Sequence, residues 1–112
     1  MKFYGLTTCD TCRKAQKELR AAGRNFDVID VRADGVSVQK LQDWASKIDW
    51  KTLLNTRSTT WRKLSPEDKD GVDEKKAVSL MATHPTLIKR PIIEKGEQIY
   101  VGWTSATKDA VL

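Results

Sequence analysis

The sequence has few cysteines and histidines and no long apolar run. Two cysteines and one histidine occur among its 112 residues, too few for the usual four zinc ligands without carboxylates, so no metal site is predicted. No apolar stretch approaches the roughly 20 residues of a membrane span, and the first residues lack the apolar core of a signal peptide. We therefore expect a cytoplasmic protein, in a reducing compartment and away from membranes.

Positive charge is in excess but not concentrated. The formal net charge is +5, yet acids interrupt the basic residues, as in residues 67–70 and 73–76. The basic run, or the interleaved basic and aromatic pattern, of a nucleic-acid module is missing. A solvated surface explains most of these charges and an anionic small substrate explains the remainder, so no direct nucleic-acid binding is predicted.

Both cysteines lie in one stretch, Cys9-Asp10-Thr11-Cys12. A short apolar run precedes them and a helix-like run from Arg13 to Ala22 follows, which places the thiols where a loop meets a helix. A helix N-terminus presents unpaired N–H groups and a partial positive charge. Together with Arg13 and Lys14, this environment predicts a lowered pKa and enhanced reactivity for Cys9.

The pair has other interpretations. It fits a structural disulfide, half of a zinc site, or two small buried apolar residues. A bridge between residues three apart closes too small a loop to stabilise the fold much. Redox or nucleophilic chemistry is therefore the favoured interpretation.

The order of elements predicts the fold of one domain covering residues 1–112. Residues 2–5 and 25–31 are typical of strands, and the helix between them carries Cys12, Ala15, Leu19 and Ala22 on one stripe. Residues 86–93 and 98–103 indicate an antiparallel hairpin around a glycine turn, followed by a short terminal helix. This βαβ and ββα order, with a helical insertion between, predicts an α/β thioredoxin-like fold with a mixed four-stranded sheet.

The helical insertion is expected at about residues 34–85. Ser37, Ser65 and Asp73 each stand where a helix N-cap is needed. We expect Trp44 and Trp50 in the core of this segment rather than on a binding platform. The polar stretch from Asn55 to Leu64 lacks a clean period and predicts a loop or a broken helix.

Three stretches together resemble the ArsC/Spx family, the arsenate-reductase-related branch of thioredoxin-like proteins. They are Tyr4-Gly5-Leu6-Thr7-Thr8-Cys9-Asp10-Thr11-Cys12-Arg13-Lys14-Ala15, residues 53–64 (Leu-Leu-Asn-Thr-Arg-Ser-Thr-Thr-Trp-Arg-Lys-Leu) and residues 84–93 (His-Pro-Thr-Leu-Ile-Lys-Arg-Pro-Ile-Ile). The resemblance covers essentially the whole chain and is greatest to the YffB subgroup. It implies glutathione-dependent thiol chemistry on a small anionic or disulfide substrate, with glutathione or a glutaredoxin-type thiol as donor and no bound cofactor.

The resemblance also implies roles for single residues. Cys9 aligns with the family's nucleophilic cysteine and Arg90 with an oxyanion-binding arginine, whose planar fork suits an oxyanion or carboxylate. Pro91 aligns with the proline held in the cis form beside the active cysteine. We further expect Thr8, Arg13, Arg57 and Pro91 to help bind the substrate, although Arg57 equally fits a solvated loop.

The sequence departs from the family pattern in two ways. The second arginine of true arsenate reductases falls at Asn55 and the third near Gly102, which weakens the prediction of arsenate reduction. Cys12, absent from arsenate reductases of this type, is present in the Spx regulators. Cys12 is therefore either a resolving thiol, which attacks a mixed disulfide at Cys9, or a buried residue of the first helix.

Three functions remain open at this point. The leading prediction is a thiol–disulfide oxidoreductase in which Cys9, Cys12 and Arg90 are catalytic. Arsenate reduction proper, dependent on glutathione and glutaredoxin, is the second. The third is an Spx-like regulator that binds RNA polymerase and is switched by a Cys9–Cys12 disulfide.

Overall fold

The computed structural model describes all 112 residues and divides them into two compact units. The sheet unit comprises Met1–Asp34 and Arg90–Leu112, and the helical unit comprises Gly35–Lys89. None of the helices combines the length and the apolar character that crossing a bilayer requires. The single domain, with its insertion at about residues 34–85, stays a prediction.

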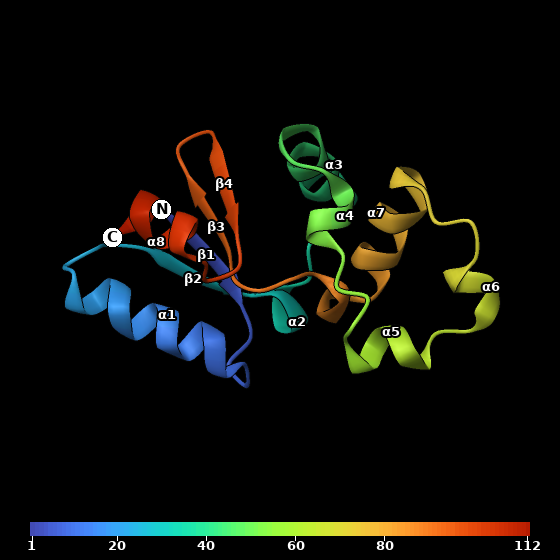
Figure 1. The fold of residues 1–112 in the computed structure, drawn as a ribbon, viewed down its shortest axis with the longest axis horizontal. Coiled ribbons are helices and arrows are strands. Elements are labelled where there is room, and N and C mark those ends of the chain that lie inside the picture. The colour runs from blue at the N-terminus through green and yellow to red at the C-terminus, as the bar shows by residue number, and fades with distance from the viewer. The chain divides into compact units, whose positions relative to one another are not determined.

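The sheet unit contains four strands in the order β2-β1-β3-β4 (Figure 1). They are β1 (Lys2–Gly5), β2 (Asp27–Asp30), β3 (Ile92–Lys95) and β4 (Gln98–Val101). β1 runs parallel to β2, with Phe3 opposite Val28, and antiparallel to β3, which pairs antiparallel with β4. With α1 (Asp10–Ala21) between the parallel strands and α8 (Ser105–Val111) after the hairpin, this topology confirms the thioredoxin-like α/β prediction.

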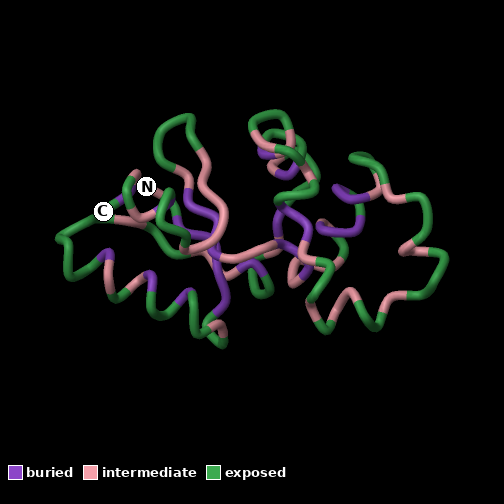
Figure 2. Tube along the Cα trace, in the orientation of Figure 1, coloured by how far each residue is buried: buried purple, intermediate pink, exposed green.

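One apolar cluster holds this unit together. It contains Phe3, Cys12, Ala15, Leu19, Ile93 and Val111, all essentially inaccessible to solvent. Three of these residues form the predicted stripe of α1, and Figure 2 shows buried segments recurring along that helix. The cluster therefore joins α1 and α8 to the two central strands, β1 and β3.

Two apolar residues of these elements lie outside the core, and one of them, Ala22, was wrongly predicted on the buried stripe. Ala22 is exposed, because it follows the last residue of α1 and Gly23, at φ +74°, turns the chain away. Val28 is 48% exposed, because β2 is an edge strand with a neighbour on one side only. The buried apolar residue there is Val31, which begins the short helix α2 (Val31–Asp34).

The helical unit is a series of short, capped helices. They are α3 (Val38–Lys47), α4 (Trp50–Leu53), α5 (Thr59–Lys63), α6 (Pro66–Lys69), α7 (Glu74–Thr83) and the 3₁₀ turn η1 (Pro85–Leu87). The predicted N-caps are confirmed, since the side chains of Ser37, Ser65 and Asp73 each accept a hydrogen bond from a backbone N–H of the following turn. Such a cap contributes about 1 kcal/mol. Short helices can persist here because their free N–H groups are satisfied locally.

The core of the helical unit includes one of the two predicted tryptophans. Trp44 is fully buried with Leu41, Leu53, Met81 and Leu87. Trp50 is only half-buried, because it stands at the first position of α4 and lines an open cavity. The prediction that Trp50 belongs to the core is therefore wrong.

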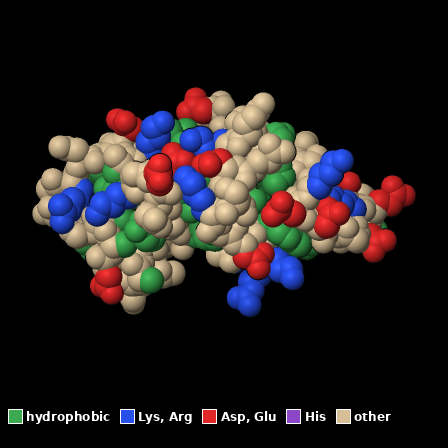
Figure 3. All heavy atoms as spheres, turned by 90° about the horizontal axis from the view of Figure 1, so that it is seen from above, with side chains coloured by type: hydrophobic (Ala, Val, Ile, Leu, Met, Phe, Trp, Pro, Cys, Tyr) green, Lys and Arg blue, Asp and Glu red, His purple; other side chains and the backbone are tan.

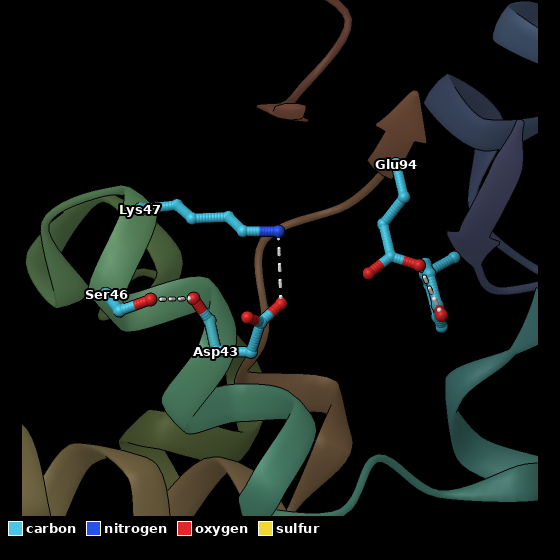
Figure 4. Close-up of polar contacts among 5 residues, drawn as sticks. Asp43, Ser46, Lys47 and Glu94 are labelled. Atoms are coloured by element: carbon cyan, nitrogen blue, oxygen red, sulfur yellow. Dashed lines mark hydrogen bonds and ion pairs between the residues drawn. The ribbon is translucent and has the colours of Figure 1, made fainter. Parts of the chain in front are cut away.

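Figure 4 shows polar contacts from each unit. Within α3, Lys47 Nζ lies 3.2 Å from Asp43 Oδ2, an exposed pair of the kind that contributes a few tenths of a kcal/mol. In the sheet unit, Tyr4 Oη donates to Glu94 Oε1 at 2.8 Å, from β1 to β3. Burial, followed by this contact with Glu94, raises the pKa of Tyr4, so the phenol stays protonated and keeps its donor.

Gly5 is required by the close packing of β1 against α1. A Cβ atom at this position would lie 2.8 Å from Cys12 Sγ and 3.0 Å from Phe3 Cε1. Both distances are shorter than a normal van der Waals contact, and both neighbours belong to the buried cluster. The side chain of Cys12 therefore occupies the space that any larger residue at position 5 would need.

We predict that Gly5→Ala destabilises the protein by about 1–3 kcal/mol through overpacking. Urea unfolding followed by circular dichroism measures the change. In a Cys12→Ala background the same substitution should cost less, because the nearest atom, Cys12 Sγ, is gone. An equal cost in both backgrounds would show that Cys12 is not the obstacle.

Candidate active site

Cys9 stands at the N-cap position of α1. Its backbone is extended (φ −87°, ψ 116°), its N–H donates to the carbonyl of Leu6 at 3.2 Å, and its own carbonyl accepts from the N–H of Arg13 at 3.0 Å. The residue is half-buried, whereas the loop residues Thr7 and Thr8 before it are exposed. The turn therefore holds a reachable thiol at the positive end of the helix.

The surroundings of Cys9 favour the thiolate. Burial on its own raises the pKa of Cys9, but contacts with the backbone N–H and thiol of Cys12 and with the guanidinium of Arg90 outweigh it, so the pKa is lowered. The side chain of Cys9 accepts no capping hydrogen bond from the first turn of α1. The N–H of Cys12 therefore acts on the thiol mainly as a nearby dipole. Two donors from separate elements thus stabilise one negative charge.

Cys12 has the opposite character. Its side chain is fully buried in the apolar cluster, and burial, with the neighbouring Cys9 as a smaller cause, raises the pKa of Cys12 to about 12. Both cysteines are free thiols in this structure. A reagent from solvent therefore meets a reactive Cys9 first and has no direct access to Cys12.

Arg90 and Pro91 approach the same turn from the segment before β3. The Arg90–Pro91 peptide bond is cis, as the family resemblance implied. Pro91 is buried, and its carbonyl accepts a hydrogen bond from the N–H of Gly102 at 2.8 Å. The structure thus brings Cys9, Cys12 and Arg90 together, since the guanidinium lies close enough to both thiols to help lower the pKa of Cys9 and to oppose part of the rise in the pKa of Cys12.

The remaining predicted binding residues are placed less favourably. Arg13 is exposed in the first turn of α1 and forms an ion pair with Asp10, which uses part of its charge. Arg57 is exposed and belongs to the helical unit. Substrate contacts of Thr8, Arg13, Arg57 and Pro91 stay predictions.

Asp30 is a residue of the site that the sequence analysis did not single out. Its carboxylate accepts hydrogen bonds from the N–H groups of Arg32, at 2.8 Å, and Ala33, at 3.0 Å. The bond from Ala33, followed by smaller contributions that include the N–H of Thr7, lowers the pKa of Asp30. Asp30 therefore links the end of β2 to the loop before Cys9. An aspartate at a strand end before a new helix was the available signal.

The two positions that lack arginine have local structural roles. Asn55 Oδ1 accepts from the N–H of Arg57 at 3.0 Å, and the N–H of Asn55 donates to the carbonyl of Leu87 at 2.8 Å. Gly102 has φ +78°, a conformation that an arginine would adopt only with strain. Both residues are thus needed for the turns in which they stand.

The surface around these elements mixes both signs of charge. On the face shown in Figure 3, Lys and Arg side chains lie beside Asp and Glu side chains instead of forming one basic stripe. No group of three His, Cys, Asp or Glu side chains is placed to hold a metal ion. The reactive and charged side chains that lie together at the cysteines are the two thiols, of Cys9 and Cys12, and the guanidinium of Arg90.

A thioredoxin-like sheet with a cysteine at the start of its first helix and a cis-proline before its third strand defines the class of this protein. Comparison with known families then gives the particular group. The model of the ArsC family matches residues 4–111, which is nearly the whole chain. The chain belongs to the ArsC family.

Three similar proteins place the chain within that family. The solved structure titled YFFB (PA3664) protein is 37% identical, with a TM-score of 0.94 over 99% of this chain and 97% of that one. An uncharacterised protein of Haemophilus influenzae is 39% identical, over 89% of this chain and 88% of its own length. The global transcriptional regulator Spx of Listeria innocua is 26% identical, over 90% and 78%. The similarity to the YffB subgroup and to Spx is confirmed.

We predict that Arg90 sets the reactivity of Cys9. Alkylation of Cys9 by iodoacetamide, followed by mass spectrometry across pH, should show a midpoint below the ordinary thiol value of about 8.5. Arg90→Gln should raise that midpoint by about 1 unit, because a cation next to the thiolate is removed. A midpoint unchanged by the substitution would show that the guanidinium does not act on the thiolate.

A matched pair of substitutions tests the contact between the two thiols. Cys12→Ser keeps a hydrogen-bond donor next to Cys9, whereas Cys12→Ala removes it. The alkylation midpoint of Cys9 should therefore be higher in the alanine variant than in the serine variant. Equal midpoints would exclude a contribution from the side chain at position 12.

Asp30→Ala should loosen the loop before Cys9. The N–H of Thr7 then loses its acceptor, and its hydrogen exchange should accelerate while amides of the central strand β1 keep theirs. In the wild-type protein the protection factor of this amide, which corrects for the slower intrinsic exchange at low pH, should fall as the pH falls through the lowered pKa of Asp30, because protonation weakens the acceptor. Uniform acceleration across the sheet would instead indicate global destabilisation.

Proposed function

We propose that the chain is a thiol–disulfide oxidoreductase of the reducing cytoplasm that draws its electrons from glutathione or a glutaredoxin-type thiol. One observation carries the proposal. Cys9 is the thiol that solvent can reach, and its pKa is lowered by contacts with the Cys12 thiol and the Arg90 guanidinium. Cys12, in contrast, is buried. That asymmetry is what a nucleophile and a resolving thiol require.

In the first step, the Cys9 thiolate attacks one sulfur of the substrate disulfide. A Cys9–substrate mixed disulfide forms, the substrate's S–S bond breaks, and the other substrate sulfur leaves as a thiolate that takes a proton from water. The exposed Thr7-Thr8 loop limits the approach to Cys9, and we place Thr8 against the substrate there.

In the second step, the buried Cys12 attacks the Cys9 sulfur. The negative charge of Cys9 contributes to the raised pKa of Cys12, and that contribution disappears when Cys9 enters a disulfide. Cys12 loses its proton to the leaving thiolate, an internal Cys9–Cys12 disulfide forms, and the reduced substrate departs. Cys12 is thus the resolving thiol, and its burial delays its action until Cys9 has reacted.

In the third step, two equivalents of glutathione restore the dithiol. One thiolate opens the internal disulfide, the second releases glutathione disulfide, and two electrons pass to the enzyme. The substrate disulfide is reduced to two thiols for each glutathione disulfide formed. No bound cofactor takes part in these steps.

Arg90 acts both on the nucleophile and on the substrate. In the resting protein its positive charge stabilises the Cys9 thiolate. Once Cys9 is covalently bound, that charge is no longer neutralised and is available to a carboxylate of glutathione or of an anionic substrate, through two parallel hydrogen bonds. The same guanidinium therefore favours small substrates that carry negative charge.

The proposal predicts different defects in the two cysteine variants. With a glutathionylated cysteine peptide as substrate and excess glutathione, Cys9→Ser should abolish turnover, because the nucleophile is removed. Mixed with the same peptide in the absence of free glutathione, Cys12→Ser should retain the first step and accumulate a glutathione adduct at Cys9, detectable by mass spectrometry at an added mass of one glutathione, because no second thiol is present to resolve it. Wild-type turnover by Cys9→Ser would overturn the proposal.

Family membership also supports arsenate reduction as an alternative. Against it, the positions of two expected arginines are held by Asn55 and Gly102, which serve local turns. An assay with arsenate, glutathione and glutaredoxin separates the two activities. Turnover of arsenate without reduction of the mixed disulfide would favour the alternative.

The Spx relative supports a second candidate function. A Cys9–Cys12 disulfide would act as a redox switch on binding to RNA polymerase. Pull-down of the polymerase α subunit by oxidised and by reduced protein tests this function. Absence of binding in both states would exclude it.

A further inference from the structure

One cavity of this protein lies wholly within the helical unit. Its volume is about 820 Å³, within the range of small-molecule sites. All of its lining residues lie between positions 50 and 89, including the half-buried Trp50 and Trp61. Neither of the cysteines contributes to it, so the chemistry of Cys9 does not account for this cavity.

The charge of the lining is of one sign. Lys51, Arg57, Lys69 and Lys89 contribute to the wall, and no acidic residue does. None of the four takes part in an ion pair of the structure. Lys69 Nζ donates to the carbonyl of Arg62 at 3.2 Å, which leaves its charge unneutralised. In a protein whose charges are otherwise mixed, this wall is selective for anions.

The two tryptophans give the same wall an aromatic character. Trp50 begins α4, with Lys51 Nζ 5.7 Å from its ring centroid. Trp61 lies on α5. Indole rings that are only half-buried offer accessible apolar and π surface, on which a planar ring can stack. A bare oxyanion would leave that surface unused.

The segment that joins the two tryptophans is held in place before any ligand arrives. Asn55 Oδ1 accepts from the N–H of Arg57 at 3.0 Å, and Ser58 Oγ accepts from the N–H of Trp61 at 3.1 Å. The N–H of Lys89 donates to the carbonyl of Leu53 at 2.8 Å. This bond fixes the backbone of Lys89, another cation of the wall, against the end of α4. Pre-organisation of this kind lowers the ordering cost of binding.

We propose that this cavity binds a nucleotide, with the base against Trp50 or Trp61 and the phosphates on the surrounding cations. A planar heteroaromatic ring joined to a multiply charged phosphate matches the tryptophans, the positive wall and the volume together. Arginine and lysine are the usual phosphate partners, Arg57 through paired hydrogen bonds and the lysines as point charges. The site is independent of the proposed thiol chemistry, and its test measures binding alone.

Calorimetric titration with ADP, AMP, adenosine and inorganic phosphate tests the proposal on the whole chain. ADP should bind most tightly, with AMP weaker and both adenosine and phosphate at least tenfold weaker than ADP. The affinity for ADP should fall as salt is raised from 50 to 300 mM, because the contacts are between charges. Quenching of tryptophan fluorescence by ADP should saturate at the same concentration.

Variants locate the ligand. Arg57→Gln and Lys51→Gln should each weaken ADP binding about tenfold or more, and Trp61→Leu should weaken ADP while leaving phosphate unchanged. Lys17→Gln, on the exposed side of α1 in the sheet unit, is the matched control and should bind ADP like the wild type. Circular dichroism verifies that each variant is folded.

Three outcomes of the ADP and phosphate measurements would overturn the proposal. They are no saturable heat or quenching with ADP at millimolar concentration, unchanged ADP affinity in both Arg57→Gln and Lys51→Gln, and phosphate binding as tightly as ADP. Tighter binding of a single-stranded oligonucleotide than of ADP would reassign the surface to nucleic acid and equally overturn it. Cys9→Ser should bind ADP normally, so failure of the thiol chemistry and failure of this site are separable.

Discussion

The electrostatic stabilisation of a thiolate at the N-terminus of α1 is the interaction on which the proposed chemistry of this protein depends. A thiolate at Cys9 is compatible with partial burial because donors from two parts of the chain face it, the Cys12 residue one turn into the helix and the Arg90 guanidinium from the segment before β3. The strand order β2-β1-β3-β4 brings those parts together across nearly the whole length of the chain. The fold thus places the guanidinium of Arg90 next to the thiol of Cys9, although some eighty residues separate the two in the sequence.

Burial divides the work between two chemically identical side chains. Cys9 and Cys12 are three residues apart, yet one is partly exposed and the other belongs to the apolar cluster of the sheet unit. The low-dielectric surroundings disfavour charge on Cys12, while the helix end and the guanidinium favour it on Cys9. The structure shows Cys12 as a core residue, and under the proposed function the same burial postpones its reaction as the resolving thiol.

Much of the fold could be predicted from the sequence because its signals are local. The α1 stripe, the N-caps Ser37, Ser65 and Asp73, and the glycine turn of the hairpin each depend on a few neighbouring residues. The features that could not be predicted depend on tertiary neighbours that are distant in the sequence. Val28 is exposed because β2 lies at an edge, Trp50 because a cavity opens beside α4, and the role of Asp30 became visible only when β2 was placed next to the loop at Thr7. Periodicity reports which residues share a face, but not whether that face is covered.

The packing of Cys12 against Gly5 has a consequence for oxidative damage. A cysteine sulfur that takes up oxygen from peroxide passes to sulfenic and then irreversibly to sulfinic and sulfonic acids, each step adding volume and polarity. The Sγ atom of Cys12 is fully enclosed and lies so close to the backbone of Gly5 that a single methyl group there would approach it to 2.8 Å. An added oxygen atom meets the same obstacle. Burial therefore protects Cys12 from irreversible oxidation more than the partly exposed Cys9. Under the proposed function, this keeps Cys12 available to convert a sulfenic acid at Cys9 into a disulfide.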